Sequence, residues 1–186
     1  MNHDEILSIV KDAYVVVWQY RGELEHVWPT PPPEDCRWFA YTEAGEAIDA
    51  MLRNNLKYRR NNAKKLDEKD EWADCLIMLL SSMENGTEID DIPVWFRFSK
   101  TSSIFPDLRV LTVDRINNCL IADDLDTIDA CGCIVQMLED ETVSRVRGRL
   151  EAIKNKQLAP ANDRLYSSTD DTQPWVIPSG TTKTVL

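Results

Sequence analysis

Four carboxylates in two short patterns are the residues of this chain best suited to chemistry. Glu43-Ala-Gly-Glu46 and Glu71-Trp-Ala-Asp74 each place two acids three positions apart. On a helix, residues at this spacing lie roughly 60° apart on one face. Two such helices packed antiparallel can direct all four carboxylates to one point. Ligand sets made only of oxygen favour Mg²⁺ or Mn²⁺ over zinc or copper.

The apolar surroundings of Asp74 indicate that this acid lies on a buried helix. Trp72 and Ala73 precede it, and the run Cys75-Leu-Ile-Met-Leu-Leu80 follows it. A helix that is apolar nearly all round is typical of a protein core. Burying an unpaired charge is costly, and neighbouring carboxylates repel each other unless cations neutralise them. The alternative is that the four acids are surface residues or salt-bridge partners of nearby Lys and Arg.

A basic segment lies between the two acidic patterns. Five cations fall within the nine residues Lys57-Tyr-Arg-Arg-Asn-Asn-Ala-Lys-Lys65 of an otherwise acidic protein. Because this segment connects the two acid-bearing helices, we expect it near one end of them. Lys and Arg bind phosphate oxygens well, so a polyphosphate is a natural ligand. The alternative is a solvated basic turn that offsets acids elsewhere.

Helical spacing of apolar residues dominates the elements that must position these groups. Helices are predicted at 5–21 with Asp4 as N-cap and Gly22 as its end, at 35–56 with Asp35 as N-cap, and near 67–83, 108–120, 128–138 and 146–153. Residues 92–98 could form a short strand or an irregular loop. The fold class is therefore expected to be all-α, an antiparallel helix bundle over residues 1–158. Residues 159–186 are expected to form a tail, disordered or packed on a neighbour.

Composition limits the classes of function. The chain has 186 residues and a net charge of −11, which argues against coating DNA or RNA but leaves a small nucleotide possible. Its strongly apolar runs are far too short to cross a membrane, and its first residues do not read as a signal peptide. Five cysteines, an odd number, favour reduced thiols and a cytoplasmic location.

The order of these motifs resembles the MazG-like all-α nucleoside triphosphate pyrophosphohydrolases. The similarity rests on Thr42-Glu-Ala-Gly-Glu-Ala-Ile-Asp49 followed by Asp70-Glu-Trp-Ala-Asp-Cys-Leu-Ile-Met-Leu-Leu80, and it covers about residues 36–84. Members of that family often begin the first motif with two adjacent glutamates. Thr42 takes the first of these places here, so any role of that extra acid does not carry over.

The resemblance implies hydrolysis of a (deoxy)nucleoside triphosphate to the monophosphate and pyrophosphate, which sanitises or remodels a nucleotide pool. Carried over by position, four acids would hold Mg²⁺, or Mn²⁺, and form the catalytic centre: Glu43, Glu46, Glu71 and Asp74. The expected substrate contacts are cations and an amide near the phosphates and two residues near the base: Lys57, Arg60, Asn61, Lys64, Trp18 and Gln19. The resemblance also implies a homodimer or homotetramer.

Two other functions remain open from the sequence. One is a related phosphoribosyl-ATP pyrophosphohydrolase, which would use similar acids. The other is a helical interaction protein that has lost catalysis. For Trp18 the alternative to base contact is a place in the core or at a subunit interface.

Overall fold

The computed structural model describes residues 1–54, 67–90, 108–120 and 124–158. The helices are α1 (His3–Leu24), α2 (Pro33–Asn54), α3 (Glu68–Ser81), α5 (Leu108–Cys119), α6 (Asp124–Leu138) and α7 (Thr142–Leu158), with the 3₁₀ helix η1 (Glu139–Glu141) before α7. None of these residues forms a strand, so the expected all-α class is confirmed for the part described. The predicted strand or loop at 92–98 and the predicted tail at 159–186 lie outside it.

Side chains at the helix starts explain where α1 and α3 begin. The Asn2 side chain accepts a hydrogen bond from the backbone N–H of Glu5 at 2.9 Å, and the Glu5 carboxylate accepts one from the backbone N–H of Asn2 at 2.7 Å. This reciprocal pair is a capping box. At α3, the Asp67 carboxylate accepts a bond from the Lys69 backbone N–H at 3.0 Å. Both caps satisfy backbone donors that the first turn leaves unpaired.

Several predicted boundaries are wrong, and α6 and α7 each begin four residues before the predicted start. Asn2 rather than Asp4 caps α1, and α2 begins at Pro33 rather than after Asp35. Proline fits the first turn of a helix because its fixed φ is helical and its missing N–H would be unpaired there anyway. Gly22 lies inside α1, which continues to Leu24. The cost of a glycine there, about 1 kcal/mol, is offset by the buried residues that follow and precede it.

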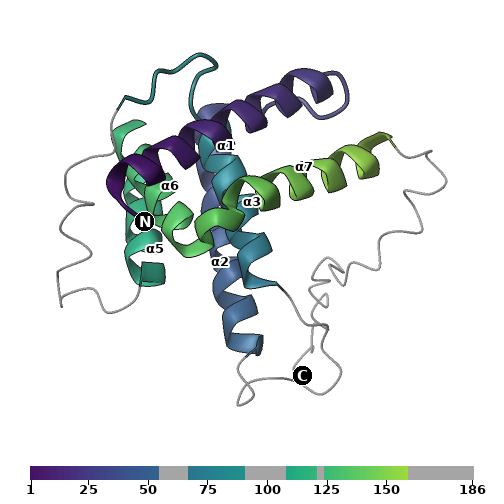
Figure 1. Cartoon of the computed structure of the whole chain (residues 1–186). Coiled ribbons are helices and arrows are strands. Elements are labelled where there is room, and N and C mark those ends of the chain that lie inside the picture. Colours follow the sequence, from purple (N-terminus) through teal and green to yellow (C-terminus); the bar gives the residue numbers. More distant parts are fainter. Residues whose placement is uncertain (55–66, 91–107, 121–123, 159–186) are drawn as a thin grey trace, which may run out of the picture.

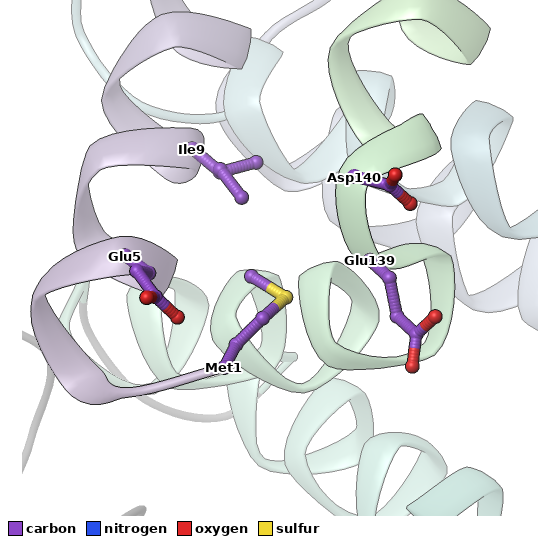
Figure 2. A pocket seen from close by; sticks show the side chains of 5 residues that line it. All are labelled: Met1, Glu5, Ile9, Glu139 and Asp140. Carbon is purple, nitrogen blue, oxygen red and sulfur yellow. The ribbon is translucent and has the colours of Figure 1, made fainter.

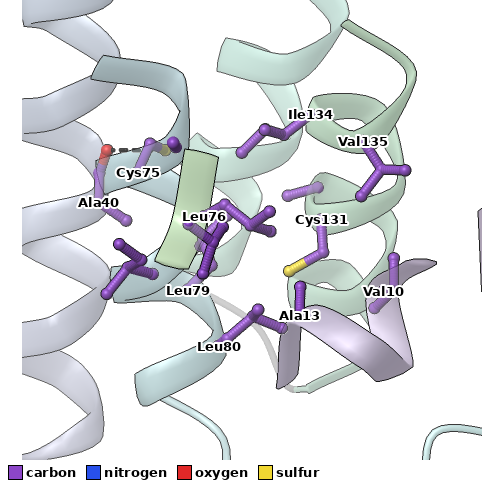
Figure 3. Packing of buried hydrophobic residues seen from close by; sticks show 14 of the residues in the cluster. Val10, Ala13, Ala40, Cys75, Leu76, Leu79, Leu80, Cys131, Ile134 and Val135 are labelled. Atoms are coloured by element: carbon purple, nitrogen blue, oxygen red, sulfur yellow. Dashed lines mark hydrogen bonds between the residues drawn. The ribbon is translucent and has the colours of Figure 1, made fainter. Parts of the chain in front are cut away.

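α2 and α3 form a closely packed antiparallel pair. The thiol of Cys75 donates a hydrogen bond to the backbone carbonyl of Ala40 at 3.2 Å, as Figure 3 shows. The buried face of α2 consists of small residues: Cys36, Ala40, Ala44, Ala47 and Ala50. Small side chains allow two helix backbones to approach closely. This contact fixes the register of the two helices that carry the acidic patterns.

α1 and α7 run across this pair and are parallel to each other (Figure 1). The Tyr20 hydroxyl donates to the Glu151 carboxylate, and one turn further along both helices Lys154 pairs with Glu23 at 3.0 Å. Residue numbers that rise together on both helices define a parallel pair. The sequence predicted an antiparallel bundle. That prediction is wrong for α1 and α7, which run parallel. Only short connections force neighbouring helices to be antiparallel, and these two helices are far apart in the chain.

α3 lies in the middle of the hydrophobic core. Its buried side chains meet residues of α1, α2 and α6 on different sides, as Figure 3 shows for Leu76, Leu79 and Leu80. All five cysteines are unpaired and buried, and burial raises the pKa of the Cys75 and Cys131 thiols well above the usual value. Such thiols behave as small apolar side chains. None of the described helices is both long and apolar enough to cross a bilayer.

Candidate metal centre

Three of the four predicted acids converge. Glu43 and Glu46 of α2 and Glu71 of α3 each offer a carboxylate oxygen, and these oxygens all lie within 4.8 Å of one another. The spacing of three on α2 puts its two acids on one face, and the antiparallel register brings Glu71 opposite them. Glu43 and Glu71 are partly buried, whereas Glu46 is exposed. The cluster is therefore anchored in the helix interface and accessible from solvent on one side.

The cluster is electrostatically unfavourable by itself. Burial, followed by the negative charges of Asp74, Glu46 and Glu71, raises the pKa of Glu43 to about 7. Burial also raises the pKa of Glu71; the charge of Arg149 opposes this effect. Among the described residues, no cation forms an ion pair with any of the three clustered carboxylates. A buried acid with its pKa near neutrality and a specific charged neighbourhood is typical of a functional site.

Asp74, the fourth predicted ligand, is held by an arginine of another helix. The Nε of Arg149 in α7 donates to both carboxylate oxygens of Asp74, at 2.9 and 3.0 Å, and its Nη2 donates to Oδ2 as well. Asp74 is thus a salt-bridge partner, which was the alternative interpretation of all four acids. It remains a neighbour of the cluster, because its charge is the largest charge effect that raises the pKa of Glu43.

Arg149 is a residue that the sequence analysis missed. The apolar positions Val146 and Leu150 predicted a helix there, and both are buried in α7. Arg145 and Arg149 are four residues apart, as are Asp70 and Asp74 on α3. This matched spacing of opposite charges is a signal in the sequence. It could not be used without knowing that α7 packs against α3.

None of the predicted substrate contacts that the structure describes lies at the acidic cluster. Trp18 is partly buried against the core, edge to face with Tyr14 at a centroid distance of 6.3 Å. Gln19 is exposed and donates to Glu23 at 3.2 Å. The Tyr14 hydroxyl donates to the Glu84 carbonyl just beyond α3, so Trp18 lies near the end of α3 opposite Glu71. The four predicted phosphate contacts lie outside the described residues: Lys57, Arg60, Asn61 and Lys64.

Arg21 is a second charged group with unusual surroundings. It is only 1% exposed, its Nε donates to the Ser81 hydroxyl at 3.0 Å, and its guanidinium lies 3.7 Å from the ring centre of Trp28. Its Nη1 has no hydrogen-bond partner within the described part of the chain, and burial lowers its pKa. These contacts tie α1 and the start of the connector to the last turn of α3, away from the acidic cluster.

A hollow of about 440 Å³ lies between the first turn of α1 and η1, as Figure 2 shows. It is lined by Met1, Glu5, Ile9, Glu139 and Asp140. None of the acids of the candidate centre lines it, so it is a separate feature of the surface.

The clustered side chains fit a hard divalent cation. All the donors are carboxylate oxygens, they come from two helices of fixed register, and the exposed Glu46 leaves the group open to solvent. Mg²⁺ binds such oxygen sets while keeping several of its waters. Comparisons with protein-family models, with curated proteins and with solved structures found no match to this chain.

Proposed function

We propose that this protein is a Mg²⁺-dependent nucleoside triphosphate pyrophosphohydrolase of the MazG-like type, which releases pyrophosphate and a nucleoside monophosphate in the cytoplasm. The observation that carries the proposal is the convergence of Glu43, Glu46 and Glu71 without a cation paired to them in the described structure. A structural role would favour ion pairs, as seen for Asp74. Three acids held together against their own repulsion favour an external cation.

In this proposal Glu43, Glu46 and Glu71 hold Mg²⁺, or Mn²⁺, and Asp74 borders the site. A bound ion would supply Lewis-acid chemistry at this site. A carboxylate of the cluster takes up the proton of the attacking water as general base. Lys57, Arg60, Asn61 and Lys64 bind the phosphates. Trp18 and Gln19 are not assigned a contact with the base, because Trp18 lies near the end of α3 opposite Glu71 and Gln19 pairs with Glu23.

The test is pyrophosphate release from a panel of nucleoside and deoxynucleoside triphosphates, with Mg²⁺ or with EDTA. Activity should require Mg²⁺ and should be lost in Glu46→Gln. The matched control is Asp49→Asn, because Asp49 lies one turn further along α2 and pairs with Arg53 at 2.6 Å. Equal activity in wild type and Glu46→Gln, or no turnover of any nucleotide, would contradict the proposal.

The two alternatives are separated by the same assay. Phosphoribosyl-ATP belongs in the panel, and its selective hydrolysis would identify the first alternative. A protein that binds no divalent cation and hydrolyses no nucleotide would instead fit a helical interaction protein.

A homo-oligomer is part of the proposal, and the outer face of α2 supports it. Trp38, Tyr41 and Leu52 are 60%, 42% and 44% exposed, and with the exposed Gly45 they form one stripe opposite the core face. A Cβ built at Gly45 would meet no atom within 4 Å. Trp38 and Leu52 lie seven residues on either side of Gly45, so two copies of α2 can cross there antiparallel with Trp38 against Leu52. This self-complementarity suits a twofold interface.

The oligomer is tested by light scattering coupled to size exclusion. Wild type should elute as a dimer or tetramer, and the double variant Trp38→Glu with Leu52→Glu should shift to monomer. Val15→Glu is the control, because Val15 is 63% exposed on α1, outside the stripe. A monomeric wild type, or an unchanged mass in the double variant, would contradict the proposal that the α2 stripe forms a dimer interface.

A further inference from the structure

Two arginines of α7 pair with acids of α3 in two successive turns. Arg145 donates to Asp70 at 2.7 Å and to Asp67 at 3.0 Å, and it also pairs with Glu141 at 2.7 Å. Arg149, one turn later, donates to Asp74. Both arginines therefore hold α7 against α3, and they differ in what lies beside them.

The carboxylates that Arg145 binds are outside the acidic cluster. Arg149 binds the one acid that borders the cluster, and its positive charge acts on both Glu43 and Glu71. Among the described residues, Arg149 is thus a cation whose charge acts directly on the acids of the candidate metal centre. The Arg149 side chain is 36% exposed and that of Asp74 is 16% exposed. The guanidinium can change partner there without opening the core, unlike that of the buried Arg21.

We infer that Arg149 is a phosphate-binding residue of the site, which occupies Asp74 in the metal-free protein and donates to a phosphate of the bound polyphosphate once Asp74 turns toward the cation. This inference rests on the proposed function. The planar fork that now binds the two oxygens of Asp74 matches two oxygens of a phosphate equally well. The exchange also keeps charge balanced, since Asp74 gains the cation while Arg149 gains the anionic ligand.

The experiment measures two affinities without turnover: that of Mn²⁺ alone, by the electron spin resonance of free Mn²⁺, and that of inorganic pyrophosphate with Mn²⁺ present, by calorimetry. The variants are Arg149→Gln, Arg149→Lys and, as the matched control, Arg145→Gln. We expect Arg149→Gln to weaken pyrophosphate binding at least tenfold while Mn²⁺ binds as tightly as in wild type or tighter. Arg145→Gln should leave both affinities within twofold and lower only the melting temperature.

Arg149→Lys decides the question if Arg149→Gln does not fold. Lysine keeps the charge beside Asp74 but lacks the two-point geometry, so pyrophosphate binding should still weaken several-fold. Pyrophosphate affinity within twofold of wild type in a folded Arg149 variant would overturn the inference and leave Arg149 a purely structural partner of Asp74.

The result also separates this inference from the proposed function. Wild type that binds Mn²⁺ and pyrophosphate through Arg149 but hydrolyses no nucleotide would disprove the hydrolase and support the inference. If wild type hydrolyses nucleotides and the Arg149 variants bind pyrophosphate as tightly as wild type, the hydrolase is supported and the inference is disproved. Wild type that binds neither Mn²⁺ nor pyrophosphate would overturn both.

Discussion

The two sides of α3 carry the same residue types and have opposite surroundings. On the side that faces α2, Glu71 meets Glu43 and Glu46, and carboxylate faces carboxylate. On the side that faces α7, Asp70 and Asp74 meet Arg145 and Arg149. On the side of α3 toward α7, arginines neutralise the carboxylates. On the side toward α2, the negative charges of the carboxylates lie close together.

This contrast shows which acids can be explained by stability alone. Ion pairs between α3 and α7 account for Asp70 and Asp74 as links between two helices. The described packing does not stabilise the close approach of the Glu43 and Glu71 carboxylates, since burial and repulsion raise the pKa of both. Groups that oppose folding persist where they serve a ligand, so the side toward α2 is the candidate for function.

The largest expected effect is on activity and belongs to the side toward α2. Glu71→Gln should lower pyrophosphate release by about 100-fold or more, because it removes one oxygen ligand that stabilises charge in the transition state. Thermal unfolding of the metal-free variant should be unchanged or occur at higher temperature, since one repelling charge is gone. A marked loss of stability with full activity would place Glu71 among the structural acids.

Asp74→Asn should destabilise the metal-free protein by about 2 kcal/mol, measured by chemical denaturation. The change leaves the Arg149 guanidinium with a neutral partner in a half-buried place, where breaking one side of an ion pair is costly. From the sequence alone, Glu46→Gln or Asp74→Asn is expected to preserve or raise stability, because removing one acid relieves repulsion. The salt bridge reverses that expectation for Asp74. Stability equal to or above that of wild type would show that the Arg149 contact contributes nothing.

The pH dependence of stability isolates Glu43. Its pKa is about 7 in the folded protein and 4.5 in the ordinary carboxyl, so between these values the folded state binds more protons than the unfolded state. The free energy of unfolding of the metal-free protein therefore falls as pH rises from about 5 to 7 and then levels off. Solvent screening of this partly exposed group limits the contribution to about 1 kcal/mol.

Glu43→Gln should remove that part of the slope. Asp129, whose pKa burial raises to about 6, contributes a slope of the same sign in both proteins and cancels in the difference. Denaturation at a series of pH values with EDTA present measures both curves. Parallel curves for wild type and variant would show that Glu43 titrates normally.

The smallest effect is expected on the side toward α7, at its exposed edge. Lys69 pairs with Glu141 at 2.7 Å, but their side chains are 38% and 45% exposed. Lys69→Met should change the free energy of unfolding by less than about 0.5 kcal/mol, as exposed pairs usually do. A loss of more than about 1 kcal/mol in denaturation would show that the ion pairs of this side act as one network.

Much of the helical framework could be read from apolar spacing. The buried faces of α2 and α3 follow from residues such as Ala40, Ala47, Cys75 and Leu79, and both helices were predicted within a few residues of their ends. Caps were harder, because Asn2 needed Glu5 to complete its hydrogen bonds and single residues do not reveal such pairs. The parallel course of α1 and α7 could not be predicted, since distant segments carry no short loop that fixes their direction.

The sequence by itself determined that helices form, which of their faces are apolar, and that acids recur three positions apart on two of them, because these features depend only on local geometry. The tertiary structure alone decided which charges meet. Glu71 became part of an acidic cluster and Asp74, three residues later, became an ion-pair partner, because the angle of about 60° between them around the helix axis is enough to turn them toward different neighbours. Coulomb energies depend on distances in space, and spacing along one helix does not contain the position of the next.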